Sequence, residues 1–326
     1  MLSSAILAVS TAPAGASPPP VPADDYAGSQ EILAPDISSS RVAPTSIDPA
    51  GYWTPEKLAN AIPMDLIATD EDGAEARSGQ TTEPLVEEPG TIVDPVAPTV
   101  ESYDSRAFPP VKHVPKTAGK IFYHLDGKDY VCSGATVNHA NKNMIVTAAH
   151  CLYTPGKGWH SKIVFIPAYY NGSQPHGLWN WKGGRTHNAW IQDENWSYDQ
   201  AFITFFPRNG VELVEKVGGN GVSYGYSTTE PEMRVFGWPA QAPYDGELPY
   251  YCEGPTTDFS PLNSDAKIAC LMNEGASGGP WLRQIINDDL GYVSAVTSRK
   301  TLSGSPRYLV ATPFTMETRA MYYEMT

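Results

Sequence analysis

The sequence predicts an all-β domain of two small packed antiparallel barrels, closed by a C-terminal helix and preceded by a largely disordered N-terminal region. Three observations support this fold class. Short β-prone runs separated by turns fill the chain after Lys120, no long amphipathic helix separates these runs, and acidic residues and prolines are concentrated before residue 111. Because a parallel α/β sheet requires helices between its strands, an antiparallel barrel or sandwich is preferred.

The formal charge of −14 on the 326 residues is unevenly distributed. Residues 1–110 hold 17 Asp and Glu against 4 Lys and Arg, together with 16 of the 30 prolines. Residues 111–326 hold 19 acidic and 18 basic residues. The acidity therefore marks a boundary near residue 110. No basic patch indicates nucleic-acid binding and no segment is long and apolar enough to span a membrane, so neither is expected as a partner.

The chain begins with "MLSSAILAVSTAPAGAS", a short apolar run followed by Ala14-Gly15-Ala16, which is typical of a signal-peptide cleavage site. The basic leader of a signal peptide is missing. Residues 1–16 are interpreted as a truncated secretion signal, with an apolar disordered tail as the alternative. Residues 17–110 are rich in Pro, Ser, Asp and Glu and cannot bury enough apolar area to fold alone, which is typical of an acidic pro-region.

One island in this region, "YWTPEKLANAIPMDL", has the pattern of a short helix. Thr54 is a favourable N-cap, and Pro55 is favourable at the first helical position. Leu58 and Ala61 lie three residues apart on one face, and the pattern ends before Pro63. We expect a helix over residues 55–61 that needs a partner surface.

Turns and strands follow Lys120. In "KIFYHLDGKDYVCSGATV", Asp126-Gly127 between two β-prone runs predicts a hairpin. Met316, Ala320 and Tyr323 recur at helical spacing in the C-terminal stretch and predict one closing helix. Further strands are predicted at "KIVFIPAY", "AFITFF", "MRVFGWP", "WLRQII", "YVSAVTS" and "RYLVATPF".

Three short stretches carry residues suited to nucleophilic catalysis. "TAAHC" places His150 just after an apolar strand, "SYDQAFITF" places Asp199 at the mouth of another, and "NEGASGGPW" places Ser277 among glycines. A serine hydroxyl is a poor nucleophile, so it needs an imidazole to take its proton, and that imidazole needs a buried carboxylate to fix its tautomer. Gly275 allows a turn in which the amides of Gly275 and Ser277 point at a developing oxyanion.

Two simpler interpretations exist for these stretches. Gly, Ser and Pro are common in surface turns, and an acid before an apolar run is often only a strand cap. "GASGG" also fits the G-x-S-x-G nucleophile elbow of α/β-hydrolases, which requires a histidine after the serine. The last of the seven histidines is His187, so the elbow is excluded.

"TAAHC", "YDQAF" and "GASGGPW", in this order, resemble the chymotrypsin-fold serine peptidases. "FGWPA" and "CLMNEGASGGPW" resemble in particular the secreted bacterial branch related to glutamyl endopeptidases. The resemblance covers about residues 115–326 and implies two six-stranded barrels, with residues 111–326 as the peptidase domain. It implies His150 as general base, Asp199 as orienting acid and Ser277 as nucleophile in the cleft between the barrels.

Four cysteines allow three pairings, and the sequence alone does not choose among them. The resemblance implies a histidine-loop disulfide between Cys132 and Cys151, which leaves Cys252 with Cys270. Disulfides favour an extracellular location. We expect polypeptide substrates, a monomer, and neither cofactor nor metal. "NDDLG" at residues 287–291 is interpreted as a hairpin tip rather than a calcium site.

The resemblance also locates a specificity pocket. Its base is expected near Leu271 and Met272, and one wall at Thr297 and Ser298. No aspartate that would select Lys or Arg is present, and Thr297 stands where glutamyl endopeptidases carry a histidine. Arg299 is interpreted either as a group that attracts an acidic side chain or as a solvated surface residue.

A further departure is Ala276, which stands where trypsin-like animal enzymes carry an aspartate that pairs with the new N-terminus on activation. Activation therefore has to act differently, for example by release of the pro-region. We expect Trp53 and the helix after it to dock on the peptidase domain, and the mature chain to begin between Arg106 and Lys120.

The sequence as a whole predicts a secreted serine endopeptidase that acts through an acyl-enzyme. Two alternatives are an esterase-like hydrolase on the same fold and a non-catalytic binding or adhesion protein on a protease scaffold.

Overall fold

The computed structural model describes residues 38–42, 49–64, 67–68, 88–99, 114–260, 264–301 and 306–325, with the backbone alone for 67–68. All of these residues belong to one unit, Asp36–Thr326. The signal-peptide prediction for residues 1–16 lies outside the described residues, as does most of the predicted pro-region.

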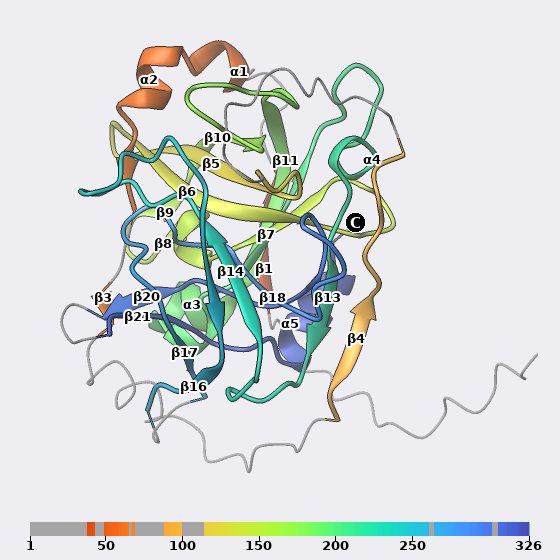
Figure 1. The fold of residues 1–326 in the computed structure, drawn as a ribbon. Helices are drawn as coiled ribbons and strands as arrows, with labels where there is room; N and C mark the ends of the chain where they lie inside the picture. Colours follow the sequence, from red (N-terminus) through yellow and green to blue (C-terminus); the bar gives the residue numbers. More distant parts are fainter. Residues whose placement is uncertain are drawn as a thin grey trace, which may run out of the picture. The chain divides into compact units, whose positions relative to one another are not determined.

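Six antiparallel strands close into a first barrel (Figure 1). Around the barrel the order is β11-β10-β5-β6-β7-β12, and β12 pairs back onto β11. Apolar side chains on these strands, such as Phe122, Ile145 and Phe202, are fully buried. The strands are β5 (Ala118–Leu125), β6 (Lys128–Val137), β7 (Met144–Thr147), β10 (Ser161–Pro167), β11 (Trp179–His187) and β12 (Ala201–Phe205).

The hairpin between β5 and β6 turns at the two residues that the sequence singled out. Asp126 and Gly127 have φ values of 48° and 76°, the left-handed values that a two-residue turn of this kind requires. Leu125 and Lys128 are paired across it. The predicted hairpin is confirmed.

The second half consists of two sheets that share a smaller apolar core. One sheet has the order β15-β14-β18-β19-β13-β4 and the other β16-β17-β21-β20-β3. Val235 and Ala295 of the first sheet belong to the same buried cluster as Ile268 and Leu309 of the second. The strands are β3 (Ile67–Ala68), β4 (Gly90–Val93), β13 (Gly221–Tyr224), β14 (Met233–Gly237), β15 (Tyr250–Gly254), β16 (Thr256–Asp258), β17 (Ala266–Ala269), β18 (Pro280–Arg283), β19 (Tyr292–Val296), β20 (Arg299–Thr301) and β21 (Tyr308–Ala311).

The predicted chymotrypsin-like double barrel is confirmed, with one difference in the second half. There the described strands form two facing sheets instead of one continuous ladder, and β13 pairs with β19 in parallel. The loop containing residues 287–291 connects β18 to β19, as predicted.

The segment before residue 100 adds several elements to the two halves. Strand β1 (Ser38–Val42) pairs with β11, β2 (Ile62–Pro63) pairs with β6, and β3 and β4 extend the two sheets of the second half. Two short helices, α1 (Pro49–Tyr52) and α2 (Pro55–Ala59), lie on the first barrel near β5 and β10 (Figure 1).

The predicted docking of Trp53 and of helix α2 after it is confirmed by the contacts of this segment. The Thr54 side chain accepts a hydrogen bond from the Lys57 backbone N–H, and the helix ends at Ala59, two residues earlier than expected. Trp53 is buried, its ring centroid lies 5.5 Å from that of Phe122, and its Nε1–H donates to the Lys162 carbonyl at 2.7 Å.

The C-terminal helix α5 (Met316–Tyr323) is also present, but its buried face differs from the predicted one. Met321 and Tyr322 are buried, whereas Met316 and Tyr323 are exposed. The Tyr322 hydroxyl donates to the Asn138 carbonyl at 2.7 Å. The closing helix forms as predicted, but the barrel contacts the face opposite to the predicted apolar stripe.

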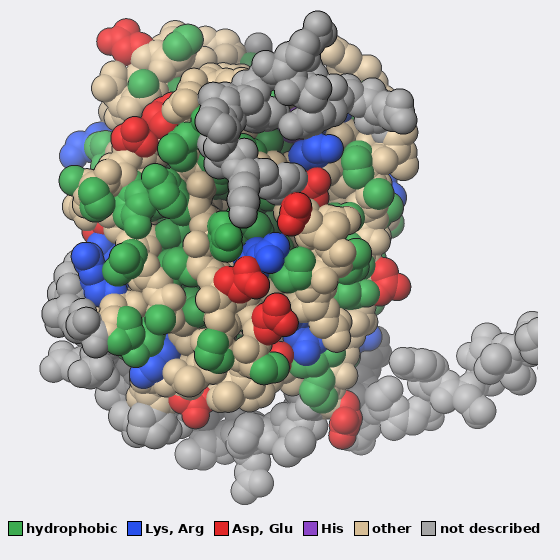
Figure 2. Space-filling model, in the orientation of Figure 1, with side chains coloured by type: hydrophobic (Ala, Val, Ile, Leu, Met, Phe, Trp, Pro, Cys, Tyr) green, Lys and Arg blue, Asp and Glu red, His purple; other side chains and the backbone are tan. Residues whose placement is uncertain are grey.

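No helix among the described residues is long and apolar enough to cross a membrane. On the face drawn in Figure 2, acidic and basic side chains are interspersed with hydrophobic ones. This agrees with the near balance of charges in residues 111–326.

Candidate active site

His150 lies in the first barrel directly after β7. That strand ends at Thr147, two small buried alanines follow, and His150 falls within the short 3-10 helix η2 (Ala149–Cys151). The His150 backbone N–H donates to Oδ1 of Asp199 at 2.9 Å, and Nδ1 lies 2.8 Å from Oδ2 of the same carboxylate. The structure thus brings these two predicted site residues together.

Asp199 follows the 3-10 helix η3 (Trp196–Tyr198) and precedes β12. Its buried carboxylate also accepts a hydrogen bond from the Ser298 hydroxyl at 2.7 Å. Burial alone would raise the pKa of Asp199, but the facing His150 and the hydrogen bonds from His150 and Ser298 lower that pKa below its ordinary value. An ionised carboxylate only accepts, so Nδ1 of His150 carries a hydrogen and Nε2 of the neutral ring is left as an acceptor.

Ser277 lies in the turn before β18 and is almost completely buried. Its carbonyl oxygen accepts a hydrogen bond from the Ser133 backbone N–H at 2.7 Å and lies 3.9 Å from Sγ of Cys151. A side-chain nitrogen of His150 lies within 4.8 Å of that sulfur. Ser277 and His150 therefore both lie near the Cys132–Cys151 disulfide, and Nε2 of His150 has no hydrogen-bond partner among the described residues.

The turn has left-handed backbone at two glycines. Gly275 has a φ of 97°, and a Cβ at this position would lie 2.6 Å from the Trp238 carbonyl oxygen. Gly278 has a φ of 77°, and a Cβ there would collide with Thr147 and with the Ser133 carbonyl. Only glycine fits at both positions. The Gly275 amide, a predicted oxyanion donor, points to the carbonyl oxygen of Met64 at 3.4 Å.

The residues predicted to form the specificity pocket have different surroundings in the structure. Leu271 is 61% exposed, and its place near the base of the pocket stays a prediction. Met272 is buried in the smaller apolar core, and the Thr297 hydroxyl accepts from Nε1–H of Trp281 at 3.0 Å. Ser298 contacts the Asp199 carboxylate, as described above.

Arg299 is fully buried, which overturns its interpretation as a solvated surface residue. Its guanidinium is paired with the buried Asp265 carboxylate and lies 4.9 Å from the centre of the Trp196 ring. A cation that is already paired in this way is poorly placed to select an acidic substrate side chain.

Two disulfides join Cys132 to Cys151 and Cys252 to Cys270, which is the pairing that the resemblance implied. The first ties β6 to the residue after His150. The second ties β15 of one sheet to the end of β17 in the other.

The N-terminal segment crosses the site. Met64 donates its N–H to the Val131 carbonyl at 3.0 Å, and its own carbonyl faces the Gly275 amide. Before it, β2 runs parallel to β6, and after it, β3 runs parallel to β20. Backbone pairing therefore holds the segment on both halves of the molecule.

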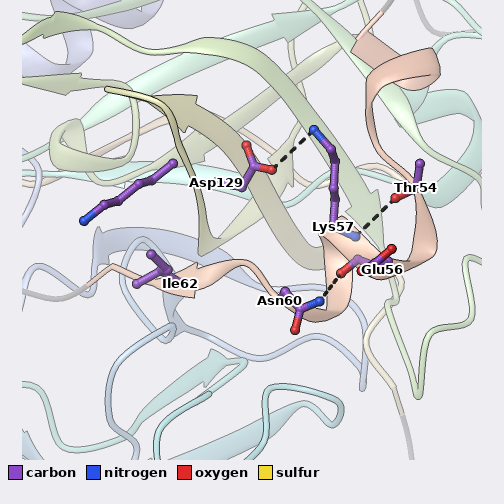
Figure 3. A pocket seen from close by; sticks show the side chains of 7 residues that line it. Thr54, Glu56, Lys57, Asn60, Ile62 and Asp129 are labelled. Carbon is purple, nitrogen blue, oxygen red and sulfur yellow. Dashed lines mark hydrogen bonds and ion pairs between the residues drawn. The ribbon is translucent and has the colours of Figure 1, made fainter.

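An open crevice lies beside α2, lined by polar and charged side chains (Figure 3). Lys57 of the helix lies 3.8 Å from Asp129 of β6 across this crevice. None of the predicted site residues lines it, so it belongs to the contact between the N-terminal segment and the first barrel.

Comparison with solved structures finds bacterial serine proteases. The protease Anisep from Arthrobacter nicotinovorans is 36% identical, with a TM-score of 0.59, and the match covers 64% of this chain and 95% of that one. The chain belongs to the bacterial serine proteases of the chymotrypsin fold. A thermostable serine protease from an extremophilic microorganism, AL20, is 27% identical over 64% of this chain and 96% of that one, also with a TM-score of 0.59.

Two further comparisons find a more distant and a partial match. A Glu endopeptidase with 15% identity and a TM-score of 0.52 shares the fold over 71% of this serine protease chain and 96% of its own. An extracellular metalloprotease of Bacillus subtilis (strain 168) is 33% identical over 116 residues, which is 35% of this chain and only a third, 33%, of that protein. No family model matches the chain.

The name of the Bacillus protein raises the question of a metal. Among the described residues, the group of possible ligands is Cys132, His150 and Cys151. Both sulfurs are in the disulfide and Nδ1 of His150 faces Asp199. Metal binding requires thiolates and free ring nitrogens, so this group does not fit a metal ion.

Several residues around the site of this serine protease carry no local sequence signal. They act through contacts between positions far apart in the chain. Examples are the hydrogen bond from Ser298 to Asp199, the crossing of the site by Met64, and the contacts of Ser133 with the turn at Gly275 and of Asn273 with Gln241. No local pattern marks them.

Proposed function

We propose that the protein is a secreted serine endopeptidase that hydrolyses peptide bonds through an acyl-enzyme, with His150, Asp199 and Ser277 as its catalytic residues. The observation that carries this proposal is the His150–Asp199 pair. The Asp199 carboxylate is buried, has a lowered pKa and accepts three hydrogen bonds, and Nε2 of His150 has no hydrogen-bond partner among the described residues. The match to serine proteases supports it.

In the first half of the reaction, Oγ of Ser277 attacks the carbonyl carbon of the scissile bond, and its proton moves to Nε2 of His150. The π electrons of the carbonyl move to oxygen, which becomes an oxyanion that the amides of Gly275 and Ser277 stabilise. Return of these electrons breaks the C–N bond, and the leaving amine takes the proton from His150. The acyl group remains as an ester on Ser277.

In the second half, water attacks this ester and gives its proton to His150. Collapse of the new oxyanion breaks the ester bond, Oγ takes the proton back, and the free carboxylic acid leaves. Asp199 holds the ring of His150 throughout and stabilises the cation that forms twice in each cycle.

A fluorophosphonate probe tests this proposal on the processed protein. We expect covalent labelling of the peptide that contains Ser277, loss of labelling in Ser277→Ala, and normal labelling in Ser223→Ala, which removes another buried serine hydroxyl. Processed protein that folds but is not labelled would favour the binding or adhesion protein. Labelled protein that cleaves esters but no peptide would favour the esterase-like hydrolase.

We also propose that residues 17–110 are a pro-region and residues 111–326 the peptidase domain. The contacts of Trp53 and Met64 support this division, because the N-terminal segment binds at the proposed site without supplying a catalytic residue. Limited digestion is expected to leave a stable fragment of about 210 residues with equal or higher activity. A protein that starts near Val111, folds and is inactive, while the full chain cleaves substrate, would show that the segment is part of the active enzyme.

The two disulfides support secretion. We propose polypeptides as substrates and a monomer as the active form.

A further inference from the structure

The turn that carries the proposed oxyanion donors has one charged side chain, that of Glu274 at its start, which is paired with Lys300. Ala276 at its centre is buried and packs against Gly237, where an added Cβ would lie 2.8 Å from the Ala276 Cβ. The Gly275 amide must nevertheless keep one direction, because an oxyanion is stabilised only by donors that already point at it.

The direction of this amide is fixed through the carbonyl of the same peptide group. The Gly275 N–H belongs to the peptide whose carbonyl is that of Glu274, and this carbonyl accepts a hydrogen bond from the Ala240 N–H at 2.6 Å. In a planar trans peptide the N–H points away from the C=O. Holding the Glu274 carbonyl against Ala240 therefore directs the Gly275 N–H toward the opposite side.

Ser133 attaches the segment that carries Ala240 to the turn. This serine of β6 is fully buried, and its hydroxyl donates to the Gly275 carbonyl at 2.8 Å while accepting from the Trp238 N–H at 3.0 Å. Its backbone N–H also binds the Ser277 carbonyl. One residue thus contacts both ends of the turn and the start of segment 238–241.

Asn273 makes the second attachment. Its buried side-chain amide donates to the Gln241 carbonyl at 2.6 Å, and its Oδ1 accepts from the Gln241 N–H at 3.3 Å. The segment 238–241 is thereby held at both ends, by Ser133 at Trp238 and by Asn273 at Gln241, with Ala240 between them.

We infer that Ser133 and Asn273 are positioning residues for the proposed oxyanion hole: through segment 238–241 they fix the peptide that presents the Gly275 amide. This inference rests on the proposed function. Loss of either attachment is expected to impair stabilisation of the oxyanion more than substrate binding, because the amide contributes most when negative charge develops on the oxygen.

The test compares processed wild-type protein with Ser133→Ala, Asn273→Ala and Thr204→Val. Thr204 is the matched control, because its buried hydroxyl donates to the Gly183 carbonyl at 3.2 Å within the first barrel. For each protein we would measure kcat and KM on one peptide substrate, the inhibition constants of the matching peptide aldehyde and peptide alcohol, and the melting temperature.

We expect kcat to fall about 10- to 100-fold in the Ser133 and Asn273 variants, less than the roughly 10²- to 10³-fold for complete loss of one donor. KM and the inhibition constant of the peptide alcohol are expected to stay within about twofold of the wild-type values. The inhibition constant of the peptide aldehyde is expected to rise in parallel with the loss in kcat, because only the aldehyde adduct forms an oxyanion. Asn273→Asp, which keeps Oδ1 but loses the donor to Gln241, is expected to lie between wild type and Asn273→Ala.

The inference is overturned if both variants match Thr204→Val, or if KM and the alcohol constant rise as much as the aldehyde constant. If Ser133→Ala melts below the assay temperature, the inference is tested with the Asn273 variants alone. A wild-type protein that is neither active nor labelled by fluorophosphonate would instead refute the proposed function.

A different observation, the path of the N-terminal segment, carries a second inference. In the proposed mechanism His150 gives a proton to the leaving amine, so the chain that follows a scissile bond must leave beside His150. His150 is held on the first barrel, next to β6, by the Cys132–Cys151 disulfide. We therefore expect the part of a substrate after the bond to lie along β6, and the part before it along β20.

The segment runs the other way. Residues 62–63, which precede Met64, pair with β6, and residues 67–68, which follow it, pair with β20. We propose that this segment is an intramolecular inhibitor bound in the direction opposite to a substrate, so that it occupies the Gly275 amide without being cut at Met64. This inference also rests on the proposed function.

The test uses the full chain with Met64→Pro, which removes the N–H that binds the Val131 carbonyl, and Met64→Ala, which keeps it. With the chain shown to be intact by mass spectrometry, Met64→Pro is expected to hydrolyse a short chromogenic peptide at least tenfold faster than wild type or Met64→Ala. Equal rates for the two variants, or a wild-type product cut between Met64 and Asp65, would overturn the inference. Inactivity of the processed wild-type protein would count against the proposed function instead.

Discussion

Replacing Asp199 by asparagine tests the proposed catalytic acid with almost no change in shape. Both carboxylate oxygens face only donors: Oδ1 accepts from the His150 backbone, and Oδ2 from the His150 ring and from Ser298. An asparagine amide must point its NH₂ group at one of these two sets. The backbone N–H cannot change, so the NH₂ group is expected to take the Oδ2 position.

With the NH₂ group in that position, Nδ1 of His150 has to become an acceptor and the ring hydrogen moves to Nε2. This tautomer cannot take the proton of Ser277. We expect kcat on a peptide substrate at neutral pH to fall about 10⁴-fold, which corresponds to roughly 5 kcal/mol of activation free energy. Circular dichroism is expected to show that the variant is folded and unfolds in a cooperative transition.

Asp193→Asn, at the end of α3 (Asn188–Asp193), is the control and is expected to keep wild-type activity. If Asp193 or Asp258 proved to be the sensitive acid, or if Asp199→Asn kept a tenth of the wild-type rate, the assignment of Asp199 would be wrong.

Three further predictions concern the nucleophile, the docked segment and a buried lysine. Ser277→Ala is expected to lower peptidase activity about 10⁶-fold without unfolding, and a tenth of the wild-type turnover would place the nucleophile elsewhere. Trp53→Ala is expected to weaken docking of the N-terminal segment by about 3–5 kcal/mol, and Trp53→Phe by about 1 kcal/mol, measured by hydrogen exchange over residues 49–64; equal effects would refute the packing argument. Burial lowers the pKa of Lys120 to about 8 from its ordinary value of 10.5, despite the nearby Glu247 and Asp245. Between these pH values the unfolded chain keeps a proton that the folded chain has lost, so the unfolding free energy of wild type is expected to rise with pH relative to Lys120→Met, and a constant difference in urea titrations would contradict this.

Local chemistry explains which parts of the fold the sequence predicts. The hairpin depends on Asp126-Gly127, whose preference for left-handed backbone predicts the turn from local sequence. The helix after Thr54 starts where capping predicts. For the C-terminal helix, in contrast, its existence follows from spacing, but its buried face depends on which residues the first barrel offers to Tyr322.

The site also contains residues that local sequence predicts and residues that it does not. His150, Asp199 and Ser277 stand out because each follows or precedes a short apolar strand in a recognisable stretch. The burial of Arg299 cannot be predicted from its local sequence, because its partner Asp265 lies 34 positions away in the chain. The path of Met64 over the turn at Gly275 depends on a contact between residues more than 200 positions apart, which no periodicity records.

Trapping the acyl-enzyme is the most direct test of the proposed mechanism. Processed protein mixed with a peptide ester and quenched in acid within the first turnover is expected to carry the acyl group on the peptide that contains Ser277. The adduct is expected to be absent in Ser277→Ala and to decay at the rate of product release. Hydrolysis with no adduct on any residue, or an acyl group on a residue other than Ser277, would contradict the proposed mechanism.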